Sequence, residues 1–194
     1  MYRVWLGKIS ALKEAARRLP AEIQQQAPTG PRRDAWLAGR VLLARITAPL
    51  PLPDIVYGNN GKPAFRNATL PWFNLSHSGD DIALLVSDAG EVGCDIEVIR
   101  PRKNWSRLAE ALFSDDERQE IAALPAADQL AAFWQIWTRK EAQIKQASGS
   151  VWQLAGLPPS HDVWLTQWRV TPQLWLTLCT PTPCPLTPED LEIL

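Results

Sequence analysis

Cysteine and histidine are scarce in this sequence, which holds three Cys and two His among 194 residues. Cys94, Cys179 and Cys184 form no CxxC pair, and an odd number of cysteines does not fit a disulfide framework. These absences argue against the usual zinc sites and against a fold stapled by disulfides. They predict reduced thiols, as in a cytoplasmic protein.

Long apolar runs and an excess of one charge are also missing. No apolar run approaches the roughly 18–20 residues that a membrane span requires, and the first residues, MYRVWLGKIS, contain no signal-peptide core or cleavage site. The net charge is −1, without the basic surplus that is typical of nucleic-acid binders. With 46% hydrophobic and 21% charged residues, the composition predicts a globular cytoplasmic protein that partners neither membranes nor nucleic acids.

Helix and strand patterns occur in both halves of the chain and predict an α+β fold. Ser114 and Glu117 have the spacing of a capping box, which predicts a helix to about residue 124. Asp128 is the predicted N-cap of a long helix that ends before Gly149. The other predicted helices cover residues 10–19, a short stretch to about 26, and 31–46. The predicted strands cover residues 2–9, 55–58, two or three segments of 72–99, 162–170 and 174–180.

The segment GCDIE, residues 93–97, contains two carboxylates on a predicted strand. Side chains alternate across a strand, so Asp95 and Glu97 lie on one face and Cys94 on the other, where it suits a small core position. Two acids on one face repel each other unless something positive lies between them. A metal ion, an Arg or Lys side chain, or plain solvent could each resolve this repulsion.

A third acid lies in the segment WTRKEAQIK of the long predicted helix. Glu141 and Lys145 are four residues apart and therefore neighbours on the helix, which by itself indicates an ordinary surface ion pair. Taken together, three acids without His or Cys partners suit a hard cation such as Mg²⁺. A magnesium site of this kind predicts a phosphorylated ligand, which requires additional positive charge.

Arg32, Arg33 and Arg40 on the predicted helix 31–46 supply such charge, although a solvated helix face explains them equally well. Lys62 in the segment GKP follows a glycine in a turn, but Pro63 rules out a P-loop. His77, in FNLSHSG, lies between two serines and could hold a phosphate, whereas a lone histidine is usually structural.

Four motifs, GKPAF, FNLSHSG, GCDIE and FWQIWTRKEAQIK, follow one another between residues 61 and 145. Together they resemble the signature of the Sfp-type 4′-phosphopantetheinyl transferases, in particular the shorter enterobacterial holo-acyl-carrier-protein synthases. The Arg-rich helix extends the likeness to residues 30–150. The resemblance implies a 4′-phosphopantetheinyl transferase fold, in which two similar α/β lobes with pseudo-twofold symmetry pack mainly antiparallel sheets with a long helix. We expect an N-terminal lobe of residues 1–99 on the coenzyme A side, a C-terminal lobe of residues 100–194, and a monomer.

The resemblance also implies the chemistry. Such enzymes transfer the phosphopantetheine arm of coenzyme A to a serine of an apo acyl carrier protein and release adenosine 3′,5′-bisphosphate. By motif position, the implied Mg²⁺ ligands are Asp95, Glu97 and Glu141. The implied catalytic residues are Glu141, Lys145 and Asp95, with Glu141 also proposed as the base in some members. The implied ligands of coenzyme A are Arg32, Arg33, Arg40, Lys62, Ser76, His77, Lys140 and Lys145.

Carrier proteins of this kind are acidic, and the segment RPRKNWSR could steer them through Arg100, Arg102, Lys103 and Arg107. Two alternatives remain at this stage: a metal-dependent hydrolase of nucleotide diphosphates, and a non-catalytic module that binds coenzyme A or a carrier. The class of carrier, the identity of the base, the oligomeric state and the role of the Pro-rich C-terminal tail stay open.

Overall fold

The structure is a computed structural model that describes residues 1–157 and 162–194. It confirms the α+β class, and its described strands form three sheets. The first sheet has the order β4–β5–β1–β9 and contains β1 (Tyr2–Lys8), β4 (Trp72–Ser78), β5 (Asp81–Ser87) and β9 (Glu192–Ile193). The second is the pair β2 (Ile55–Tyr57) and β3 (Pro63–Phe65). The third has the order β6–β8–β7 and contains β6 (Gly93–Val98), β7 (Trp164–Thr171) and β8 (Leu174–Thr180).

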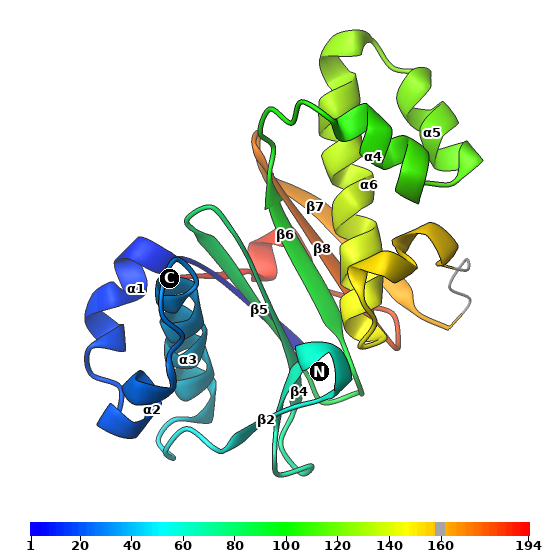
Figure 1. The fold of residues 1–194 in the computed structure, drawn as a ribbon. Helices are drawn as coiled ribbons and strands as arrows, with labels where there is room; N and C mark the ends of the chain where they lie inside the picture. Colours follow the sequence, from blue (N-terminus) through cyan, green and yellow to red (C-terminus); the bar gives the residue numbers. More distant parts are fainter. Residues whose placement is uncertain (158–161) are drawn as a thin grey trace.

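Two groups of helices flank these sheets, one in each half of the chain (Figure 1). Between β1 and β4 lie α1 (Ile9–Ala16), α2 (Ala21–Gln26) and α3 (Arg33–Thr47). Between β6 and β7 lie α4 (Trp105–Leu112), α5 (Asp115–Ala122) and α6 (Ala126–Gln146). Short 3₁₀ turns occur at η1 (Asn59–Gly61), η2 (Val151–Gly156) and η3 (Pro188–Asp190). In the part of the chain that the structure describes, none of these helices has the length and apolarity of a membrane span.

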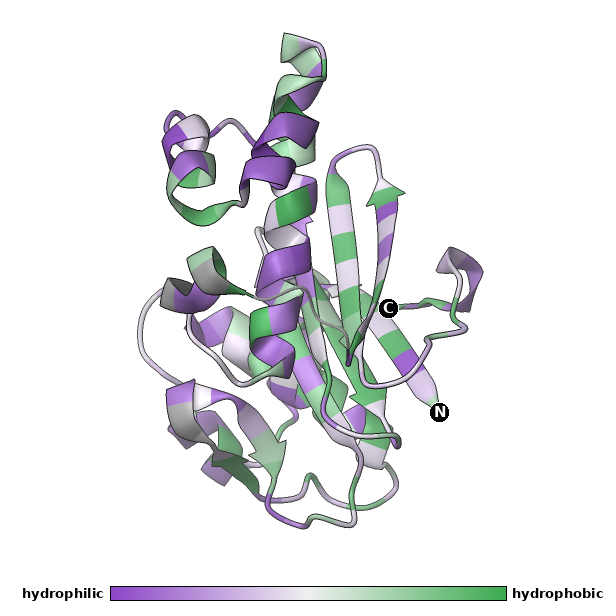
Figure 2. Cartoon of the chain, turned by 90° about the vertical axis from the view of Figure 1, so that its right-hand side faces the viewer, coloured by the Kyte–Doolittle hydropathy of each residue, from purple (hydrophilic) through white to green (hydrophobic). Residues whose placement is uncertain are grey.

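The layers follow from the alternation of side chains along the strands, visible as alternating colours in Figure 2. On β5, Leu84 packs with α1 and α3, whereas its neighbour Leu85 packs against β6 and β8. The first sheet is therefore covered by helices on one face and by the third sheet on the other. On the far side of the third sheet, α6 crosses β6 and β8, and a further cluster of aromatic residues joins it to α4 and α5.

The strand order of the first sheet is repeated in the third. The order β4–β5–β1 matches β7–β8–β6. In each set, three helices follow the strand that comes first in the chain, which is β1 in one set and β6 in the other. A division at residue 99 would separate β6 from β8, with which it pairs from Gly93 to Val98. The chain end also returns to the first sheet, because β9 pairs with Trp5 and Leu6 of β1. The two lobes stay a prediction, and the first and third sheets meet where β6 packs against β4 and β5.

Most predicted elements are confirmed, with differences at their ends. The capping box forms as expected, since the Glu117 amide donates to Ser114 Oγ (3.2 Å) and the Ser114 amide donates to Glu117 Oε2 (2.8 Å). The predicted cap of the long helix was wrong: α6 begins at Ala126 after Pro125, and Asp128 lies in its first turn. Pro125 takes the N-cap position, with φ −52° and ψ 144°, and no side-chain cap hydrogen bond forms there. The short strands β3 and β9 were not predicted.

Candidate active site

The site lies at the junction of β4 and β6, where side chains of β4 accept hydrogen bonds from backbone amides of β6. One edge of β6 pairs with β8, so every second amide of β6 points towards β4. Alternate side chains of β4 accept these amides: Asn74 from Cys94 (2.8 Å), Ser76 from Ile96 (3.2 Å) and Ser78 from Val98 (3.1 Å). This arrangement explains the alternation in FNLSHSG, and it sets the two acids of GCDIE beside the two serines.

Asp95 is buried at this junction, with 4% of its surface exposed. Its Oδ1 accepts hydrogen bonds from Lys145 Nζ (2.6 Å) and Ser76 Oγ (2.8 Å), and Lys145 Nζ also donates to Ser76 Oγ (2.9 Å). Burial alone would lower the pKa of Lys145, but the negative charge of Asp95 and the hydrogen bond to Asp95 outweigh burial, so the pKa of Lys145 is raised. The second oxygen, Asp95 Oδ2, is buried and has no hydrogen-bond partner.

Glu97 lies at the outer end of the same strand face. Its Oε2 accepts from Ser78 Oγ (2.5 Å) and from Arg100 Nη1 (3.0 Å), and burial is the main cause of its raised pKa. The Arg100 guanidinium lies 4.8 Å from the centre of the Trp134 ring, which holds it over α6. Sequence reasoning missed both contacts of Glu97. The alternation along β4 could have predicted Ser78 at this place, whereas no sequence signal pointed to Arg100.

The helix α6 brings Glu141 and Lys145 over the acids of β6. Burial, and then the nearby charge of Asp95, raise the pKa of Glu141 to about 7. The helix can lie this close because β6 begins at Gly93, whose missing Cβ would stand 2.0 Å from the Ala142 carbonyl oxygen. A carboxylate that titrates near neutral pH suits general base catalysis.

The charges opposite the paired acids are therefore Lys145 at Asp95 and Arg100 at Glu97. Within residues 1–157 and 162–194, no three Asp, Glu, His or Cys side chains converge on a point that could hold a metal ion. The donor set nevertheless suits a hard cation, because the three acids offer only oxygen ligands and Asp95 Oδ2 has no partner.

A cavity of about 450 Å³ adjoins the acids and is lined by basic and aromatic side chains. Arg32 and Arg40 of the Arg-rich segment reach it, as do Ser76 and His77 of β4. The buried Arg40 guanidinium lies 4.0 Å from the centre of the Trp36 ring and donates to the Tyr57 hydroxyl. Burial, followed by the charges of Lys145 and Arg32, lowers the pKa of His77, so the imidazole is neutral at pH 7.

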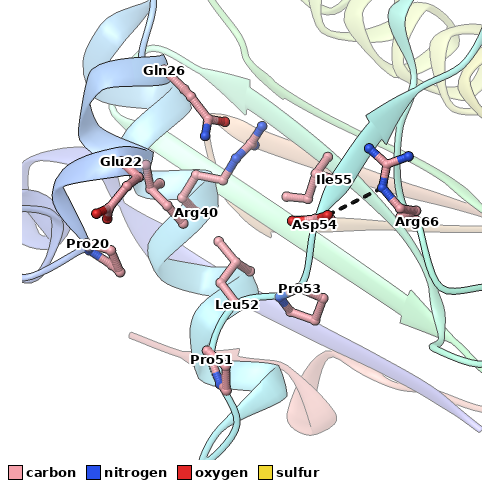
Figure 3. A pocket seen from close by; sticks show the side chains of 11 residues that line it. Pro20, Glu22, Gln26, Arg40, Pro51, Leu52, Pro53, Asp54, Ile55 and Arg66 are labelled. Carbon is pink, nitrogen blue, oxygen red and sulfur yellow. Dashed lines mark ion pairs between the residues drawn. The ribbon is translucent and has the colours of Figure 1, made fainter.

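A second cavity of about 440 Å³ shares two lining residues, Gln26 and Arg40, with the first. Figure 3 shows Gln26 and Arg40 projecting into it from one side, opposite the segment that carries Asp54 and Ile55. Arg66 closes the far end through its ion pair with Asp54, at 3.4 Å between Nε and Oδ2.

Three predicted site residues lie elsewhere. Arg33 donates to two carbonyl oxygens at the end of α2, at 3.4 and 3.5 Å, and does not line the cavity of His77. Lys62 donates to Glu91 (2.8 Å) and lines a separate cavity of about 400 Å³. Lys140 donates to Glu117 (2.9 Å), because neighbouring helix residues point about 100° apart and Glu141 takes the face towards β6.

Comparison with known proteins agrees with the motifs. A family model described as the 4′-phosphopantetheinyl transferase superfamily matches residues 91–173, which include β6 and α6. The 4′-phosphopantetheinyl transferase AcpT of Escherichia coli is 53% identical over 193 residues, 99% of this chain and 97% of the relative. AcpT of Salmonella typhi is 55% identical over 195 residues, 98% of each chain. A 4′-phosphopantetheinyl transferase of Bacillus pumilus is 43% identical over 114 residues, 56% of this chain and 48% of the relative.

The two AcpT relatives cover 99% and 98% of this chain, which includes the segment after residue 150 in which the sequence showed no motif. They confirm the resemblance drawn from the four motifs, and they favour an enzyme over a non-catalytic binding module. The chain therefore belongs to the 4′-phosphopantetheinyl transferase superfamily and is an enzyme that transfers phosphopantetheine.

Proposed function

We propose that this enzyme transfers the 4′-phosphopantetheine group of coenzyme A to a serine of an apo acyl carrier protein and releases adenosine 3′,5′-bisphosphate. The observation that carries the proposal is the position of Ser76. This side chain lines the cavity of Arg32, Arg40 and His77, and it hydrogen-bonds to Asp95. A nucleotide in the cavity would therefore place its diphosphate at the acids and lysine of the β4–β6 junction.

The nucleotide end of coenzyme A would meet the positive charges of Arg32 and Arg40. His77, neutral at pH 7, can donate one hydrogen bond to a phosphate oxygen. Lys145 Nζ donates to both Asp95 and Ser76, and Ser76 lines this cavity, so the Lys145 ammonium group would offset the charge of the diphosphate. Contact of coenzyme A with Arg33 or Lys62 stays a prediction, whereas Lys140 donates to Glu117 instead.

Asp95, Glu97 and Glu141 would hold Mg²⁺, which fits their oxygen donors and the unpartnered Asp95 Oδ2. When bound, the ion would neutralise charge on the phosphate oxygens. Glu141 would also accept the proton of the carrier serine. The serine oxygen then forms a bond to the phosphorus that carries the pantetheine, and the bond from that phosphorus to the bridging oxygen breaks. That oxygen leaves with adenosine 3′,5′-bisphosphate, and Lys145 is placed to stabilise its charge.

An acidic carrier would approach along the basic segment 100–107, which follows β6 and runs into the first turn of α4. Arg102 lies over the rings of Trp134 and Trp137, at 5.5 and 5.2 Å from their centres, while Lys103 and Arg107 are exposed. Charge reversal of the two exposed residues should raise the KM for the carrier and leave the KM for coenzyme A unchanged. An equal rise in both constants would contradict this docking site.

The test of the transfer is intact-mass spectrometry of apo carrier proteins of fatty-acid, polyketide and peptide-synthetase type, incubated with the enzyme, coenzyme A and Mg²⁺. We expect one carrier class to gain the mass of one phosphopantetheine group, and Asp95→Asn or EDTA to abolish the gain. Release of adenosine 3′,5′-bisphosphate without a modified carrier would instead indicate a hydrolase. The oligomeric state, proposed as monomeric, is measured on the same samples by light scattering.

A further inference from the structure

Lys140 is a buried cation outside the cavity and the acid cluster. Its side chain is 8% exposed and donates to Glu117 Oε2 (2.9 Å), a group that is itself 22% exposed. The ammonium group also lies 5.7 Å from the centre of the Phe113 ring. The hydrogen bonds of Asp95 go instead to Ser76 and Lys145. Lys140 therefore binds a carboxylate of α5 and not the acids of β6, although it is next to Glu141 in the sequence.

The partner of Lys140 has a second task at the same atom. Glu117 Oε2 also accepts the backbone amide of Ser114, which completes the capping box of α5. One carboxylate oxygen thus joins the first turn of α5 to the middle of α6. Because Glu117 cannot satisfy both donors if α5 shifts, the contact fixes where this helix begins.

The pair also determines where α4 lies, since only Phe113 and Ser114 separate α4 from α5. The Phe113 amide donates to the Ala109 carbonyl of α4 (2.9 Å), and its ring stacks on Phe133 of α6 with centres 5.3 Å apart. Phe113 therefore links α4 and α5 to each other and to α6. The basic segment 100–107, where the carrier is proposed to dock, runs into α4.

We propose that Lys140 is a positioning residue for the carrier protein, acting through Glu117 to hold α4, α5 and the basic segment in their docking position. This inference rests on the proposed transfer to an acidic carrier. It assigns the first lysine of the KEAQIK segment to protein recognition, while Lys145, the second, stays with the phosphates. A second ion pair between α5 and α6 joins Arg139 to Glu120. It is longer (3.4 Å), and its side chains are more exposed (29% and 49%).

The experiment measures KM and kcat for coenzyme A and for the carrier in the full-length enzyme with Mg²⁺. The first variant is Lys140→Met, which keeps the length and packing of the side-chain stem. The second is Glu117→Gln, which removes the negative charge that faces Lys140 on α5. Both should raise the KM for the carrier about tenfold and leave the KM for coenzyme A within about twofold. The control Arg139→Gln breaks the exposed pair and should change neither constant, because exposed pairs contribute little.

A rise in the KM for coenzyme A in Lys140→Met, with Glu117→Gln unaffected, would overturn the proposal and assign Lys140 to the phosphates. An unchanged KM for the carrier in both variants would overturn it as well. Thermal unfolding shows whether each variant folds, and if Lys140→Met does not, Glu117→Gln decides alone, since α5 lies outside the cavity. Failure of the wild-type enzyme to modify any carrier is a separate result and counts against the proposed function itself.

Discussion

Replacing Gly93 by alanine tests the contact that places the catalytic helix over the acids of β6. The added Cβ would stand 2.0 Å from the Ala142 oxygen and 2.4 Å from the Gln146 nitrogen, both in the backbone of α6. Because backbone atoms cannot rotate away, α6 must retreat by roughly 1 Å to reach an allowed contact of 3.0 Å. The helix carries Glu141 and Lys145 with it, so the stability and the reaction rate should both fall.

The magnitudes follow from this displacement. Overpacking of a core position costs about 1–3 kcal/mol of unfolding free energy. For a chain of this length, that lowers Tm by about 2–12 °C. A misplacement of about 1 Å at reacting groups costs on the order of 100-fold in rate. We therefore expect Gly93→Ala to fold at 25 °C but to transfer phosphopantetheine on the order of 100-fold more slowly.

The assay pairs thermal unfolding with the rate of carrier modification followed by intact mass. Gly58→Ala is the matched control, because a Cβ there meets only the Lys62 oxygen at an ordinary 3.8 Å and the backbone φ is −74°. The control should retain both Tm and rate. If Gly93→Ala also kept the wild-type values, the close approach of α6 to β6 would be refuted, and with it the reason given for glycine at this position.

Three further predictions concern single side chains of the site. The pKa of Glu141, about 7, lies above the ordinary 4.5, so ionisation of this group lowers the stability of the folded protein as pH rises from about 4.5 to 7. Without metal, Glu141→Gln should therefore have a higher Tm than the wild type at about pH 8 but not at about pH 4.5. Mg²⁺ should reduce the difference in Tm between the two proteins. An equal difference at both pH values would contradict the shift. Ser78→Ala leaves Glu97 and the Val98 amide short of a partner, and guanidinium unfolding should show a loss of about 1–3 kcal/mol. Arg40→Gln should weaken coenzyme A binding by calorimetry about tenfold or more, and an unchanged Kd would place the nucleotide elsewhere.

The sequence by itself determined the local parts of the site. Strand alternation placed Asp95 and Glu97 on one face and Cys94 in the core, and the structure confirms both positions. Helix periodicity put Lys145 one turn from Glu141, and the spacing of Ser114 and Glu117 predicted a capping box that forms. Four short motifs were enough for the family, because each describes residues that are neighbours along one strand, turn or helix.

Only the tertiary structure decided which charges face each other. The sequence could not distinguish Lys140 from Lys145, yet Lys145 meets Asp95 and Lys140 meets Glu117. Arg100 pairs with Glu97 only three residues away, but β6 ends at Val98 between them, so strand alternation gave no sign of this pair. Periodicity specifies the face of an element on which a side chain lies, but not the group that a second element places opposite that face. That group depends on how sheets and helices pack, and here α6 packs directly against β6 at Gly93.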